Sequence, residues 1–101
     1  MKKVRLVADA RREFFNEVGY YEQQRKGLGS RFRKAAEAAF IRAGEQPSSG
    51  KPGISGTRRL LVKGFPFAVV YLTSDSEVMV YAVAHISRHP DYWTARLPRD
   101  G

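Results

Sequence analysis

The chain has 101 residues and a net charge of +8, from 18 lysines and arginines against 10 acidic residues. This length allows one domain over residues 1–101, and 43% hydrophobic residues are enough to build its core. The absence of cysteine excludes disulfides, thiolate metal sites and thiol catalysis, and no apolar stretch reaches the ~20 residues that cross a bilayer. The first residues do not form a secretory signal, so we expect a cytoplasmic protein. With no cysteine and only two histidines, we expect no metal, and we expect no other cofactor. The basic charge indicates a nucleic acid or an acidic protein as partner.

The hydrophobic pattern predicts one strand and then two helices in the first half of the chain. Val4–Val7 is a short run typical of an edge strand. From Ala10 onward, apolar residues recur every three or four positions, which predicts a helix that ends near Gly27. A second, alanine-rich pattern begins at Leu28 and ends at Gly44. Because only a Gly-Leu-Gly break separates the two patterns, we expect an antiparallel helical hairpin.

Three strands are predicted in the second half, after a loop rich in glycine and proline over residues 44–57. They cover Arg58–Lys63, Phe67–Leu72 and Glu77–His85, and the short turns between them indicate an antiparallel meander. The middle run is almost entirely apolar, so we expect it to be central and covered on both faces. The predicted fold class is therefore α+β, with the helical hairpin on one face of a small antiparallel sheet in the order β-α-α-β-β-β.

Strict alternation along the last predicted strand assigns its side chains to two faces. It places Met79, Tyr81, Val83 and His85 on one face, and it places Val78, Val80, Ala82 and Ala84 on the other.

A first group of candidate functional residues opens the first of these three strands. Arg59 and Lys63 lie four positions apart and are expected on the same face, whereas Arg58 is expected on the other. Two cations on one sheet face can grip phosphate groups. The alternative is a solvated strand edge whose cations form ion pairs with nearby carboxylates.

A second group follows the last strand, where loops commonly carry function. It comprises His85, Arg88, His89, Tyr92 and Trp93. An arginine can stabilise a developing phosphate charge, and a histidine or tyrosine can move a proton. The alternative is structural: Tyr92 and Trp93 would close one end of the core, and His85 would be a hydrogen-bonded residue at the strand end.

The charge is concentrated on the second predicted helix. Between Arg25 and Arg42 there are six basic residues, Arg31 and Lys34 among them, against the single acidic residue Glu37, which gives a net charge of +5. This surface is either a docking face for an acidic partner segment or a large target, or a solvated helix face.

Several motifs together resemble the RelE/ParE superfamily, the toxin half of type II toxin–antitoxin systems, along essentially the whole chain. In chain order they are Tyr20-Tyr21-Glu22, Gly27-Leu28-Gly29, Phe32, Arg58-Arg59, the run FPFAVVY at 65–71, AVAH at 82–85, RHPDYW at 88–93 and Arg96. The resemblance implies two antiparallel helices against an antiparallel sheet. It also implies a growth-inhibiting toxin of the plasmid-stabilisation type, and a cognate antitoxin with an acidic segment that joins it in a hetero-oligomer.

The resemblance implies two different targets. RelE-like members cut mRNA on the ribosome with basic residues and a tyrosine, whereas ParE-like members inhibit DNA gyrase without cutting RNA. If the chain is a nuclease, the resemblance implies Arg59, Arg88, His85 and Tyr92 as catalytic residues. However, Leu61 and Ala68 stand where the nucleases carry cations, which favours the ParE-like function. A non-toxic basic nucleic-acid-binding domain is the third hypothesis. The residues predicted to bind target or antitoxin are Arg31, Lys34, Arg58, Lys63, His89 and Trp93.

Overall fold

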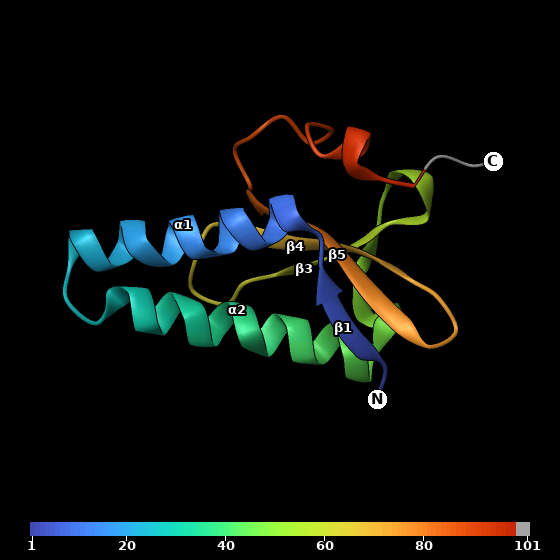
Figure 1. Cartoon of the computed structure of the whole chain (residues 1–101), viewed down its shortest axis with the longest axis horizontal. Coiled ribbons are helices and arrows are strands. Elements are labelled where there is room, and N and C mark those ends of the chain that lie inside the picture. The colour runs from blue at the N-terminus through green and yellow to red at the C-terminus, as the bar shows by residue number, and fades with distance from the viewer. Residues whose placement is uncertain (99–101) are drawn as a thin grey trace.

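Two helices and a five-stranded sheet form the main layers of the structure, a computed structural model that describes residues 1–98 (Figure 1). The order of elements is β1 (Lys3–Leu6), α1 (Ala8–Gln24), α2 (Leu28–Glu45), β2 (Lys51–Pro52), β3 (Arg58–Leu61), β4 (Phe67–Thr73) and β5 (Glu77–His85). The predicted α+β class and the helical hairpin are confirmed. The two-residue strand β2 is an addition, and it lies within the segment that the sequence indicated only as a loop.

The sheet is mixed, with the strand order β1-β5-β4-β3-β2. Strand β4 is central and its residues 67–71 are buried, as its apolar sequence predicts. Strands β2 to β5 pair in antiparallel fashion, but β1 runs parallel to β5, with Val4 opposite Val78. The prediction of an entirely antiparallel sheet is therefore wrong for β1. The helical hairpin and three strands separate β1 from β5 along the chain, so no tight turn dictates their relative direction.

The helical hairpin is closed by glycine and by one glutamate. Gly27 adopts a left-handed φ of 89°, which reverses the chain between the helices. The carboxylate of Glu22 accepts hydrogen bonds from the backbone N–H groups of Gly27 and Gly29, at 3.0–3.1 Å. It thereby pairs an amide at the start of α2 that has no partner within the helix. At Gly29, a Cβ atom would lie 2.5 Å from the carbonyl oxygen of Val18, so only glycine permits this approach of the helices.

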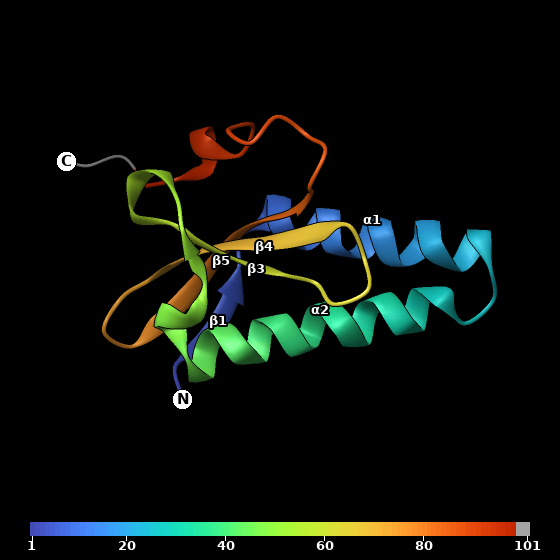
Figure 2. The same ribbon diagram turned by 180° about the vertical axis from the view of Figure 1, so that it is seen from behind.

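The helices cover one face of the sheet with an aromatic core. Phe14, Phe32 and Phe67 belong to this core, in which Phe14 and Phe32 have ring centroids 6.3 Å apart and Phe32 and Phe67 5.3 Å apart. The hairpin extends beyond the end of the sheet, as both whole-chain views show (Figure 2). Within residues 1–98, no helix is both long enough and apolar enough to cross a membrane.

The alternation predicted for β5 fails at a β-bulge. Val70 lies opposite Ala82 but Tyr71 lies opposite Val80, so Tyr81 is an extra residue on β5. After this extra residue, each side chain of β5 points to the sheet face opposite the one that strict alternation predicts. Val78, Val80 and Val83 consequently all reach the helix-covered core.

The chain after β5 covers part of the other sheet face. We call residues 86–98 the strap. Trp93 of the strap is 7% exposed and forms a second buried cluster with Val70, Ala82 and Ala84. The strap thus serves as one wall beside the open part of this face.

Candidate partner-binding groove

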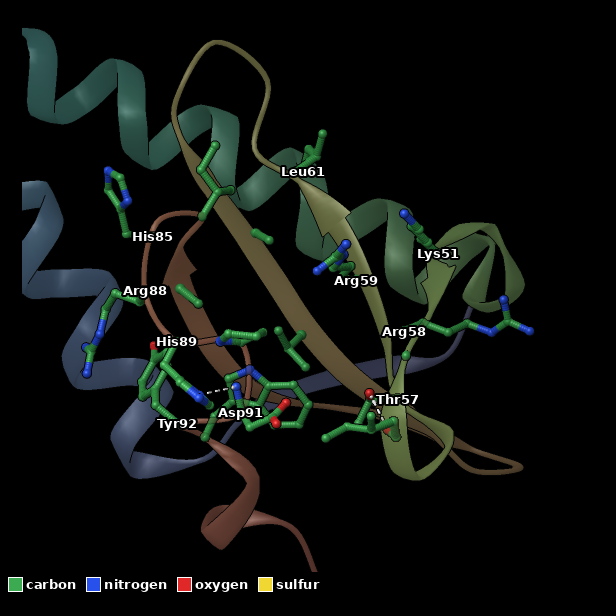
Figure 3. Close-up of a pocket in the computed structure, with 18 of the residues that line it drawn as sticks. Lys51, Thr57, Arg58, Arg59, Leu61, His85, Arg88, His89, Asp91 and Tyr92 are labelled. Carbon is green, nitrogen blue, oxygen red and sulfur yellow. Dashed lines mark hydrogen bonds between the residues drawn. The ribbon is translucent and has the colours of Figure 1, made fainter.

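A groove of about 490 Å³ lies on the sheet face opposite the helices, between the β2–β3 edge and the strap (Figure 3). Its floor includes the small or apolar side chains Ala68, Val70 and Ala84. Lys51, Arg59 and Leu61 line it on the β2–β3 side, and His85, Arg88 and His89 line it on the strap side.

The groove lining is apolar and mostly basic, with Asp91 as the one acidic residue among those of residues 1–98 that line it. Leu61 is 70% exposed and Ile86 is 62% exposed, and both border the groove. The cations Lys51, Arg59 and Arg88 are also exposed. Within residues 1–98 these three make no ion pair. The lining therefore suits a ligand that carries negative charge and apolar side chains together.

Two of these cations face each other across a pair of strands. Lys51 on β2 lies directly opposite Arg59 on β3 in the antiparallel register. Directly opposite residues share one face of the sheet, and like charges in such a pair repel each other. An anion bound between Lys51 and Arg59 would turn this repulsion into attraction.

The structure brings together most of the residues predicted as a site. Arg59, His85, Arg88, His89, Tyr92 and Trp93 all line the groove. They do not converge on one point, because the Arg88 side chain extends away from Arg59 (Figure 3). Arg58 also borders the groove, and its guanidinium donates hydrogen bonds to the carbonyl oxygens of Ser48 and Gly50.

Three predicted residues lie outside the groove lining. Lys63 is exposed in the turn after β3, whose last residue is Leu61. The expected pair of Arg59 and Lys63 on one strand face is therefore not formed. Arg31 and Lys34 are exposed on α2, which covers the opposite face of the sheet.

Lys51, which takes the place expected for Lys63 beside Arg59, is not among the residues predicted from the sequence. Lys51 lies in the loop rich in glycine and proline, where no strand is predicted. The Lys-Pro pair at 51–52 is nonetheless a recognisable signal, because lysine and proline are the residues that commonly protect an exposed sheet edge.

Both histidines of the groove are held in one tautomer. The Nδ1 atom of His85 accepts a hydrogen bond from the backbone N–H of Ser87 at 3.0 Å, and Nδ1 of His89 accepts one from the N–H of Asp91 at 3.2 Å. A neutral ring whose Nδ1 is an acceptor carries its proton on Nε2. In the neutral ring, each Nε2 is therefore a hydrogen-bond donor.

The hydroxyl of Tyr92 is engaged within the fold. It donates a hydrogen bond of 2.7 Å to Oε2 of Glu13 on α1. Burial, followed by this hydrogen bond, raises the pKa of Tyr92 well above the usual tyrosine value. Tyr92 consequently remains protonated in neutral solution, and its hydroxyl hydrogen points to Glu13. Among residues 1–98, no group of three His, Asp or Glu side chains is arranged to hold a metal ion.

Two of the comparisons with known proteins give a match, one to a family and one to a fold. Residues 4–90 match the family described as the ParE toxin of type II toxin-antitoxin system, parDE. A solved structure titled "Chromosomal ParDE TA system from P. aeruginosa" contains a chain of similar fold, with a TM-score of 0.73. That likeness covers 84% of this chain and 96% of the other at 11% sequence identity, so it concerns the fold alone. The search of curated proteins gives no match.

Proposed function

Because this chain belongs to the family of ParE toxins of type II toxin–antitoxin systems, we propose that it arrests growth by binding DNA gyrase rather than by cutting RNA. The observation that supports binding is the chemistry of the groove. Leu61 and Ala68, which stand where the resemblance implies nuclease cations, both line it. The two histidines offer donors, and the Tyr92 hydroxyl is engaged with Glu13.

We further propose that the antitoxin inserts an acidic segment with apolar side chains into the groove. Its carboxylates would lie between Lys51 and Arg59, where they relieve the repulsion of these opposed cations. Its apolar side chains would cover the exposed Leu61 and Ile86. Toxin and antitoxin then form a hetero-oligomer in which the groove is occupied.

The target can be decided with purified protein in two parallel assays. We expect the chain to inhibit supercoiling by gyrase, and we expect translation to proceed in a reconstituted system with the mRNA intact. The variant Arg59→Gln should weaken gyrase inhibition, and Lys34→Gln on α2 is a control of equal charge change.

Two results would contradict the gyrase proposal. Cleavage of mRNA in the ribosomal A site, with supercoiling unaffected, would instead support the endonuclease hypothesis. Inactivity in both assays, together with failure to arrest growth on induced expression, would leave only a basic nucleic-acid-binding domain. Rescue of growth by coexpression of the neighbouring reading frame tests the antitoxin independently of the target.

A further inference from the structure

The strap is attached to the rest of the fold at a partly buried carboxylate, that of Glu13 on α1. The side chain of Glu13 is 15% exposed and that of its partner Arg96 is 16% exposed. Arg96 Nη1 donates to Oε1 and Arg96 Nη2 donates to Oε2, each at 2.9 Å. Tyr92 adds the third bond from the strap. A two-pronged, charge-assisted pair of this kind fixes both distance and orientation.

The side chains of Glu13 and Arg96 also pair backbone groups along the edge of β5. Strand β1 ends at Leu6, opposite Val80, so β5 continues beyond its parallel neighbour. Past that point, the backbone N–H of Val83 donates to Oε1 of Glu13 at 3.1 Å. The carbonyl oxygen of Tyr81 accepts a hydrogen bond from Arg96 Nη1 at 3.0 Å. Glu13 and Arg96 thus pair backbone groups that β1 does not reach.

Tyr92 in turn contacts Arg88, a cation at the rim of the groove. The guanidinium carbon of Arg88 lies 3.7 Å from the centre of the Tyr92 ring. Arg88 has no ion-pair partner within the described part of the chain. The ring of Tyr92 is therefore the contact that holds this guanidinium.

We propose that Glu13 and Arg96 are positioning residues for partner binding: they fix Tyr92, and Tyr92 in turn fixes Arg88 at the rim of the groove. This inference rests on the proposed function, because the place of Arg88 matters only where a partner docks along the groove. The family match ends at residue 90, so Tyr92 and Arg96 lie beyond the matched region.

The placement of Arg88 can be measured without any partner. A guanidinium stacked on an aromatic ring has its side-chain NMR resonances displaced by the ring. We expect Glu13→Gln to abolish this displacement for Arg88. Tyr92→Phe is a milder variant that keeps the ring but loses the hydroxyl, and it should reduce the displacement. Glu45→Gln, at the exposed end of α2, makes the same charge change and is the matched control, which should leave the displacement unchanged.

Trp93 shows whether the strap remains packed during these measurements. It is the only tryptophan in the chain and is buried against the sheet, so its fluorescence and its access to a quencher report on the strap. If the Arg88 resonances of Glu13→Gln match those of the wild type, the inference is overturned. The same holds if Glu45→Gln abolishes the displacement equally, since the effect would then not belong to Glu13.

A double-mutant comparison tests whether Glu13 acts through Arg88. Arg88→Ala should raise the toxin concentration needed for half-inhibition of gyrase about ten-fold. Glu13→Gln should have an effect of similar size, and the double variant should be no worse than Arg88→Ala alone. If the fold-changes of the two single variants multiply in the double variant, Glu13 does not act through Arg88 and the inference is overturned. A wild type that leaves gyrase untouched would overturn the proposed function, and the Arg88 resonances would still decide the inference.

Discussion

At the scale of single residues, the two exposed glycines of the helical hairpin illustrate opposite demands on the backbone. Gly27 lies between the helices with a φ of 89°. Gly19 lies within α1, where a Cβ atom would meet no heavy atom within 4 Å. The first position needs glycine for its conformation, whereas the second bears the entropic cost of glycine in a helix without using its freedom.

The substitutions Gly27→Ala and Gly19→Ala should therefore change stability in opposite directions. Gly27→Ala should lower the free energy of unfolding by about 1 kcal/mol, because alanine is strained in the left-handed region. Gly19→Ala should raise it by about 1 kcal/mol through helix propensity. Urea unfolding followed by circular dichroism measures both changes. Equal effects of the two substitutions would contradict the assigned backbone conformations.

Residue identity alone predicts part of the site. The cluster after β5 and Arg59 could be identified, because charged and aromatic residues next to a strand end stand out in the sequence. The tautomers of His85 and His89 could not, since each depends on the backbone N–H that happens to point at Nδ1. The partner of Tyr92 could not either, because Glu13 lies 79 residues away in the chain.

At the scale of elements, the loop between α2 and β3 is organised by one buried tyrosine. Tyr71 of β4 is fully buried, and its hydroxyl donates to the carbonyl oxygen of Pro47 at 2.7 Å. The hydroxyl oxygen of Tyr71 also accepts a hydrogen bond from the backbone N–H of Gly50 at 3.1 Å. These contacts hold the segment that leads into β2 and therefore place Lys51 beside the groove.

The variant Tyr71→Phe should loosen this segment while the core stays packed. Removing the hydroxyl leaves buried backbone groups without partners, which costs about 1–3 kcal/mol of stability. We expect the backbone amides of Gly50 and Lys51 to exchange faster with deuterated solvent, which hydrogen-exchange mass spectrometry can measure. Peptides from α1 provide the internal control. Unchanged exchange at Gly50 and Lys51 would show that Tyr71 does not organise the loop.

Elements were predictable where local periodicity governs them. The hairpin and the central strand follow from apolar spacing, and the structure has both. The β-bulge at Tyr81 was not predictable, because nothing in the local sequence distinguishes the extra residue from its alternating neighbours. The parallel pairing of β1 also could not be predicted, since no short connection constrains it.

At the scale of the whole molecule, exposed cations lie on two opposite faces. Arg31 and Lys34 are exposed on α2, and Lys51 and Arg59 lie beside the groove on the other side of the sheet. Long-range attraction depends on the sum of all charges, whereas the lifetime of a complex depends on the contacts at its interface. Matched charge reversals can therefore tell which face binds the antitoxin.

Arg59→Glu and Lys34→Glu each lower the net charge from +8 to +6. Both variants should slow association with the coexpressed antitoxin by a similar factor. Only Arg59→Glu should speed dissociation, by about ten-fold or more, because it also places a carboxylate against the acidic segment. Surface plasmon resonance separates the two rates. Faster dissociation of Lys34→Glu alone would assign the interface to α2.

The parallel pairing of β1 with β5 has a consequence for how the protein is made. Lys3 pairs with Glu77, so the first strand to leave the ribosome finds its partner only when most of the chain has been synthesised. Contacts so distant in sequence form late, since they close the largest loop. The helical hairpin is local and can form while translation continues. The groove, whose floor includes residues of β4 and β5 and whose wall is the strap, is complete only after the strap has emerged. Under the proposed function, a chain that is still being translated cannot yet bind its target through the groove, which leaves an interval for an antitoxin to be present before the groove exists.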